Sequence, residues 1–264
     1  MFLRHIFHIV TPIFFVIGIF ACSQHSTVAD ARKNKVFTEL NTTTVQQVRD
    51  IFQKHIDSIG GIQAIQHHTS YTMTGTMEEV GNNKQHPFTI QRKAPNSYYI
   101  RVNLVGIGIY ERGFDGEKMW ERTPANNRIL PNTEYDQYQE LFDFYAILHH
   151  EQWYPKILAL DQGEFGGERC HAILVETMRN TREQLLFSQQ TGLQVGVLKI
   201  GKDTNSDSII RYGQYVPQND VKIPMYWEEK LGDLHKLWKV DSFVWDQTDA
   251  DFHPPFVLNQ GISE

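Results

Sequence analysis

The sequence predicts an α+β protein that is mostly β, with a single curved antiparallel sheet of about eleven strands and helices against the concave face. Three observations support this prediction. Apolar residues recur at every second position through most of the chain, turn residues separate these stretches, and two segments show helical spacing. Strands that follow one another through tight turns pair with their neighbours, so the sheet is expected to be antiparallel.

The chain begins with a segment that is expected to be processed rather than folded. Residues 1–21 combine a basic start with a short apolar run, which is typical of a signal peptide. The stretch Ile19-Phe20-Ala21-Cys22 resembles the lipobox of bacterial lipoproteins, in which the cysteine is lipidated after cleavage. An ordinary secretory signal with a chance cysteine is the alternative. Residues 22–42 are polar and suit a tether between the lipid and the folded body.

The first predicted helix follows the tether. Thr43 and Thr44 can cap it, and Gly60-Gly61 is expected to end it. Its apolar residues recur every three or four positions, which gives one apolar stripe: Val45, Val48, Ile51, Phe52, Ile56 and Ile59.

From Ser70 the period changes to two, and strands are expected up to Pro124. One of them places a large apolar side chain on one face at every second position: Tyr98, Ile100, Val102 and Leu104. The glycines Gly106 and Gly108 predict a bend or bulge after this strand. Asp115-Gly116 then predicts a hairpin into a strand that carries Trp120.

A second helix is predicted from about Asn132, with an apolar stripe that is rich in aromatic residues: Tyr138, Leu141, Phe142, Tyr145 and Leu148. Seven strands with recurrent turns are predicted after it: 156–160, 169–176, 183–189, 195–200, 208–216, 225–230 and 236–246. Residues 43–255 are therefore expected to form one domain, and residues 256–264 a tail.

Composition and motifs exclude several classes of function. The formal net charge of -6 lacks the surplus of Lys and Arg that a nucleic-acid binder needs. The sequence has no GxSxG elbow, no HExxH spacing and no phosphate-binding glycine loop, so no enzyme, metal or cofactor is expected. Cys170 alternates with apolar residues and is predicted to be a small core residue.

Several short motifs together resemble the outer-membrane lipoprotein-sorting (LolA/LolB-like) superfamily. They are, in order, Ile59-Gly60-Gly61, Thr74-Gly75-Thr76, Arg92-Lys93-Ala94-Pro95-Asn96, Gly113-Phe114-Asp115-Gly116 with Trp120, and Phe187 leading to Thr191-Gly192-Leu193. The resemblance implies a half-barrel whose hollow holds acyl chains or lipoprotein lipid. The soluble carrier of that superfamily is not lipidated. The expected lipidation of Cys22 makes this chain resemble an anchored receptor or another lipoprotein instead.

The resulting expectation is a membrane-anchored periplasmic lipoprotein that binds or transfers hydrophobic ligands without catalysis. Its membrane attachment is expected at Cys22, and, because Ser23 follows, on the periplasmic side of the outer membrane. Strand alternation and the helical stripe predict the ligand-binding residues: Tyr98, Ile100, Val102, Leu104, Trp120, Tyr138, Phe142 and Tyr145. The main alternative is a non-catalytic interaction module of a cell-envelope assembly, with unknown protein partners. A cavity lined by Tyr98, Ile100 and Leu104 would favour the carrier, whereas a filled core with an exposed apolar patch on the convex side would favour the module.

Overall fold

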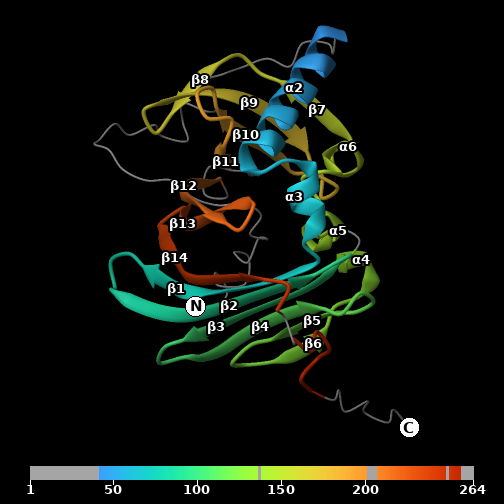
Figure 1. The fold of residues 1–264 in the computed structure, drawn as a ribbon. Helices are drawn as coiled ribbons and strands as arrows, with labels where there is room; N and C mark the ends of the chain where they lie inside the picture. The colour runs from blue at the N-terminus through green and yellow to red at the C-terminus, as the bar shows by residue number, and fades with distance from the viewer. Residues whose placement is uncertain (1–41, 136–137, 201–206, 248–249, 257–264) are drawn as a thin grey trace.

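In a computed structural model, which describes residues 42–135, 138–200, 207–247 and 250–256, the chain forms one antiparallel sheet of 14 strands (Figure 1). The sheet is open, curved and mostly β, with the helices on its concave side, as the sequence predicts. It contains more strands than the eleven or so expected. The additional ones include the short β6 (Asn127–Ile129) and β8 (Gly163–Phe165).

The predicted strand positions are close to those observed. The first half of the sheet consists of β1 (Ser70–Glu79), β2 (Lys84–Lys93), β3 (Ser97–Leu104), β4 (Gly108–Phe114), β5 (Met119–Arg122) and β6. The second half consists of β7 (Lys156–Ala159), β8, β9 (Glu168–Glu176), β10 (Arg182–Ser188), β11 (Gln194–Ile200), β12 (Ser208–Gln218), β13 (Val221–Leu231) and β14 (Leu234–Trp245).

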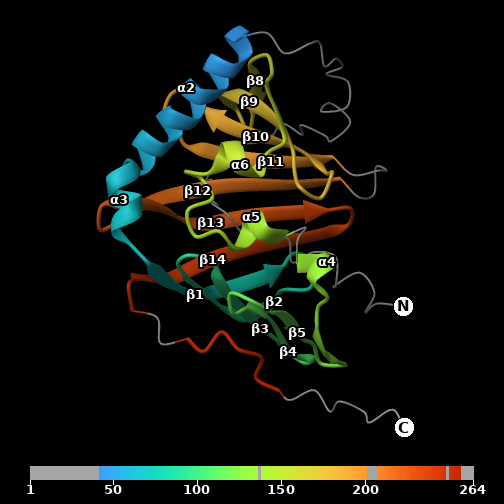
Figure 2. The ribbon, with the colours of Figure 1, turned by 90° about the vertical axis from the view of Figure 1, so that its right-hand side faces the viewer.

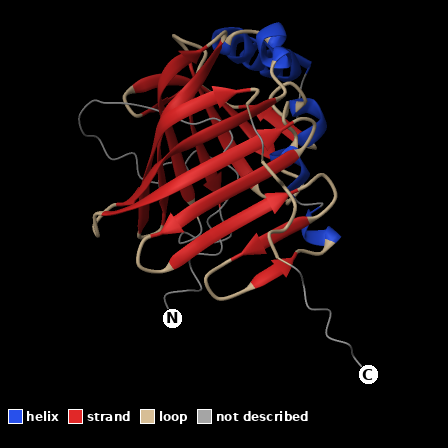
Figure 3. Cartoon of the chain, turned by 60° about the horizontal axis from the view of Figure 1, so that its bottom comes forward, coloured by secondary structure: helices blue, strands red, loops and turns tan. Residues whose placement is uncertain are grey.

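The strand order shows how the two halves join. It runs β6-β5-β4-β3-β2-β1-β14-β13-β12-β11-β10-β9-β7, with β8 attached to β9. The first and last strands, β1 and β14, therefore pair in the middle, and Figure 3 shows the strands as one continuous layer. Strands β6 and β7 lie at opposite edges, and the chain between them crosses the concave face (Figure 2).

This connection, residues 130–155, is called the covering segment below. It passes in front of the sheet in Figure 2 and contains α4 (Asn132–Tyr135), α5 (Gln139–Phe142) and α6 (His150–Trp153). The sequence predicts one continuous helix here, and the structure has three separate turns instead. Asp143 ends α5, and its carboxylate accepts a hydrogen bond from the backbone N–H of Tyr145 at 2.9 Å, which starts a new turn.

The first helix, α2 (Thr42–Ile59), lies where it is predicted, but it begins at Thr42, so Thr43 and Thr44 lie inside its first turn rather than at its N-cap, and Val45 of the predicted stripe is exposed. Its side chains Phe52 and Ile59 are buried, and α3 (Ile62–His67) continues along the same side of the sheet (Figure 2). Gly60, with φ of +135°, ends α2 against the turn between β12 and β13. A Cβ at Gly60 would lie 2.3 Å from the carbonyl oxygen of Asp220, so only glycine fits.

The two glycine-marked turns are both observed. Asp115 accepts hydrogen bonds from the N–H groups of Glu117 and Lys118, which closes the predicted hairpin between β4 and β5. Gly106 has φ of +81° in a tight turn between β3 and β4, so the predicted bend is a hairpin turn.

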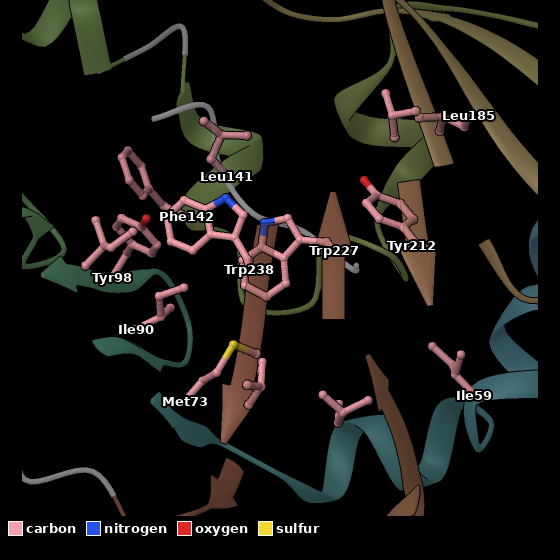
Figure 4. Packing of buried hydrophobic residues seen from close by; sticks show 14 of the residues in the cluster. Ile59, Met73, Ile90, Tyr98, Leu141, Phe142, Leu185, Tyr212, Trp227 and Trp238 are labelled. Atoms are coloured by element: carbon pink, nitrogen blue, oxygen red, sulfur yellow. The ribbon is translucent and has the colours of Figure 1, made fainter. Parts of the chain in front are cut away.

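The main core lies between the sheet and the helices. At its centre, Trp227 and Trp238 face each other across β13 and β14 and stack with ring centroids 5.1 Å apart (Figure 4). A second, smaller cluster lies on the outer face of the second half, where Phe165 packs with Cys170 and Leu186. Cys170 is buried, which confirms it as a core residue, and burial raises the pKa of its thiol to about 12.

Candidate functional site

Strand β3 provides one wall of the concave face. Tyr98, Ile100, Val102 and Leu104 share this face, and each is at most 7% exposed. Their neighbours in sequence, such as Arg101 and Asn103, are exposed on the other face. The alternation read from the sequence is therefore present in the structure, and it produces a continuous apolar wall.

Aromatic side chains of the covering segment fill the space above this wall. Phe142 stacks on Phe114 at 4.7 Å and packs against Tyr98 at 5.7 Å, as Figure 4 shows for Phe142 and Tyr98. Tyr138 and Tyr145 are partly buried against the same core. The structure thus brings together seven of the eight predicted residues around one apolar core.

Trp120 is the exception, because it lies on the opposite face of the sheet. Cross-strand pairing places it opposite Gly113, which itself pairs with Tyr99, an outer-face neighbour of Tyr98. Its indole Nε1 donates a hydrogen bond to the carbonyl oxygen of Phe252 at 2.7 Å. The C-terminal segment, residues 250–256, covers Trp120 and explains why it is fully buried without facing the hollow.

The covering segment is held to the sheet and to the end of α3 by polar contacts. The buried guanidinium of Arg92 on β2 donates to the backbone carbonyl of Asp143 at 3.0 Å. The hydroxyl of Tyr145 donates to the backbone carbonyl of His68 at 2.9 Å. Because α4, α5 and α6 are each four residues long, they depend on such contacts and on packing rather than on their own helical stability.

A cavity of about 90 Å³ remains between the covering segment and strands β10 to β12. Most of its walls are apolar: Phe52, Leu141, Ile147, Leu185, Phe187, Val197 and Ile210. Sites for small molecules usually measure about 300–1,000 Å³. The cavity is therefore smaller than a typical ligand site, and the part of the concave face beside Tyr98 and Ile100 is filled by side chains.

Charged residues form one side of this cavity. Arg179, in the turn between β9 and β10, lies 3.0 Å from Glu140 of α5 and 3.4 Å from Glu183, and Lys199 lies 3.7 Å from Glu183. The ring of Tyr138 packs over the Arg179 guanidinium at 5.5 Å. Burial raises the pKa of Glu140 to about 7, against the opposing effect of Arg179.

His150 lies at the α6 end of the same cavity. Its ring stacks on Phe52 with centroids 3.9 Å apart, and its Nδ1 faces the carbonyl oxygen of Ile147 at 3.1 Å. Burial lowers the pKa of His150, which favours the neutral ring with its proton on Nδ1. The neighbouring His149 instead pairs with Asp143 at 2.6 Å.

Sequence reasoning missed the charged side of the cavity and the tryptophan pair. Trp227 and Trp238 could have been found, because tight turns and period-two alternation place them opposite each other on one face. Glu140 and Arg179 carry no comparable signal. They are far apart in the chain, and only the path of the covering segment brings them together.

Two further observations concern the residues that the structure describes. No helix in the part of the chain that the structure describes is long and apolar enough to cross a membrane. Within the same residues, no group of three or more His, Cys, Asp or Glu side chains is placed to hold a metal ion. Cys22 lies outside the described residues, so its predicted lipidation stays a prediction.

Comparison with known proteins gives a match at the level of structure. No family model matches the sequence, and no curated protein matches it either. A DUF1329 family protein from Desulfovibrio piger is similar in structure, with a TM-score of 0.56, 10% identity, and coverage of 78% of this chain and 97% of that chain. A LolA superfamily protein from Nitrosomonas europaea gives a TM-score of 0.54 and 12% identity over 78% of this chain and 97% of that one.

A putative outer membrane lipoprotein-sorting protein domain from Vibrio parahaemolyticus has a TM-score of 0.55 and 7% identity, with coverage of 79% of this chain and 94% of that one. These similarities define the class: the chain has the LolA/LolB-like fold, an open curved sheet with helices on its concave side. At sequence identities of 7% to 12%, these similarities show the fold alone.

Proposed function

We propose that this protein binds or transfers hydrophobic molecules on the concave face of its sheet, without catalysing a reaction. The observation that carries the proposal is the covering segment. It lays aromatic side chains over a continuous apolar wall, yet it consists of three short turns held by a few polar contacts. Displacing it would exchange Phe142 and its neighbours for an acyl chain, and burying a chain contributes about 0.8 kcal/mol per CH₂. Neighbouring folds named for lipoprotein sorting support a lipid or a lipoprotein acyl chain as the ligand.

The test is binding of Nile red, an uncharged apolar dye, to the chain from residue 22 onward with Cys22→Ser. Phe142→Ala removes the side chain that fills the hollow beside Tyr98, so we expect tighter dye binding than in the unsubstituted chain. Loss of a buried Phe also costs about 3–5 kcal/mol of stability.

Phe165→Ala is the matched control, because Phe165 packs in the separate outer cluster. It should cost a similar amount of stability, measured by urea unfolding, and leave the dye affinity unchanged. Equal dye affinity for the two variants, or no dye binding at all, would argue against a ligand site on the concave face.

Attachment to a membrane through Cys22 is the second part of the proposal, with the periplasmic face of the outer membrane as the location. Its support is the resemblance of Ile19-Phe20-Ala21-Cys22 to a lipobox. The intact mass of the mature protein should equal that of residues 22–264 plus the attached acyl groups. A mature chain of unmodified mass would contradict the anchor and leave the binding proposal standing.

The alternative function, an interaction module of a cell-envelope assembly, is supported by a different observation. The concave face beside Tyr98, Ile100 and Leu104 is filled rather than open. A module of this kind would keep its core closed and bind a protein by its outer surface. The dye experiment separates the two functions, because the module would not bind Nile red in the hollow.

A further inference from the structure

Three buried polar atoms of residues that line the cavity lack a hydrogen-bond partner among the described residues. They are Glu140 Oε2, Arg179 Nη1 and His150 Nε2, and each has almost no exposed surface. The side chain of Glu140 is 9% exposed and that of Arg179 is 11% exposed. Leaving such groups unpaired costs about 1–3 kcal/mol each, so an arrangement that keeps several around one cavity points to a ligand with a polar end.

The charges around the cavity indicate which polar end fits. Two carboxylates, Glu140 and Glu183, face two cations, Arg179 and Lys199. Tyr154 interacts electrostatically with both carboxylates, and His150 and Tyr212 are further ionisable residues that line the cavity. With Glu140 ionised the four charges cancel. With Glu140 protonated, the cluster carries one excess positive charge and offers two donors, Arg179 Nη1 and the Glu140 carboxyl.

We propose that this cavity binds the carboxylate end of a fatty acid, with Arg179 Nη1 as donor to the carboxylate and Glu140 taking up a proton as the ligand enters. The inference rests on the proposed function and specifies its ligand class. Apolar residues such as Leu185 and Val197 take the first methylene groups, and the rest of the chain follows the concave face under the covering segment. A charged hydrogen bond to guanidinium is about twice as strong as a neutral one, which favours a carboxylate over an alcohol of equal length. Glu140 Oε2 and Arg179 Nη1 are the two unpaired atoms that this ligand satisfies, whereas His150 Nε2 is an acceptor and does not bind the carboxylate.

The test compares decanoate with decanol by titration calorimetry on the chain from residue 22 onward with Cys22→Ser. These ligands share a ten-carbon chain and differ in the polar end. At pH 6 we expect decanoate to bind at least ten-fold more tightly than decanol. At pH 8, titrations in phosphate and in Tris should show uptake of up to one proton for decanoate and none for decanol.

Substitutions assign the effect to residues. Arg179→Gln should abolish the preference for decanoate and keep the affinity for decanol. Arg122→Gln is the matched control, because Arg122 pairs with Glu111 on the outer face, and it should leave both affinities unchanged. Glu140→Gln mimics the protonated acid, so decanoate should bind equally well at pH 6 and pH 8 with no proton uptake.

The outcomes are distinguishable. If decanol binds as tightly as decanoate, or if no proton is taken up, the carboxylate site is wrong and the hydrophobic-binding function stands. If neither compound binds, both the site and the proposed function are wrong. The preference and the proton uptake are measured on the chain without substitutions at the cavity, so misfolding of a variant does not affect them.

Discussion

His68 is a residue on which three elements converge. Its Nδ1 lies 2.6 Å from a carboxylate oxygen of Asp246 after β14, and its Nε2 lies 2.9 Å from Asp220 in the turn between β12 and β13. Its ring stacks on Trp245 at 4.1 Å. Since His68 directly follows α3, these contacts join the helical side of the molecule to the middle of the sheet.

The carboxylate of Asp246 should make stability depend on pH in the acid range. Burial raises its pKa, but hydrogen bonds from His68 and from the N–H groups of Thr69 and Ser70 outweigh this, so the folded pKa is lowered. A lowered pKa stabilises the folded state above the unfolded value of about 3.9, and this contribution is lost as the pH falls through the folded pKa. We expect Asp246→Asn to cost about 1 kcal/mol at pH 7, a small amount because the side chain is 41% exposed, and progressively less towards pH 2.

Urea unfolding between pH 2 and pH 7 measures this difference. Asn tolerates the φ of +53° at position 246, so the backbone is unaffected by the change. Asp241→Asn is the control, because Asp241 is an exposed carboxylate on β14, the strand that precedes Asp246, and its salt bridge is to Lys239. A difference between Asp246→Asn and the unsubstituted chain that stays constant with pH would show that the carboxylate charge is not responsible.

At the scale of elements, the C-terminal segment is a structural part of the outer face. Residues 250–256 have no regular structure, yet Phe252 and Phe256 both contact Trp120. His253 Nδ1 also lies 2.9 Å from a carboxylate oxygen of Asp115, which is in the turn between β4 and β5. The segment therefore covers the only predicted site residue that points away from the hollow.

Ending the chain after Gln247 should uncover Trp120. We expect its fluorescence to shift to longer wavelength and to become accessible to acrylamide, because the indole changes from fully buried to solvated and loses its hydrogen bond. The same truncation in a Trp120→Phe background is the control and should leave the remaining tryptophan emission unchanged. Persistence of the shift in that background would mean that the truncation disturbs other parts of the sheet.

At the scale of the whole molecule, local patterns predicted the strands well and the tertiary arrangement partly. The alternation in β3 and the turn at Asp115-Gly116 are properties of neighbouring residues, so the sequence contains them directly. The break in the predicted second helix depends on Asp143, whose carboxylate binds Tyr145, His149 and Trp153 after the chain has turned. Period-two spacing also does not say which face of a strand points inward, and the pairing of Trp120 with Gly113 places Trp120 on the outer face.

The charged side of the cavity was beyond prediction for the same reason. Glu140 is on the covering segment and Arg179 is in a hairpin turn of the second half, so no spacing in the sequence relates them. Their meeting depends on the strand order, in which β6 and β7 are at opposite edges. Local sequence patterns do not predict which distant segments the strand order brings into contact.

The path of the covering segment also limits how much the molecule could hold. The sheet curves like an arc when viewed from the side (Figure 1), and the covering segment spans the open side of this arc between its two edge strands, β6 and β7. Any molecule that enters between the sheet and the covering segment must push this segment outwards, or the two edge strands must move closer together to give it slack. The contour length of residues 130–155, rather than the chemistry of any one strand, would then set the largest cross-section that fits.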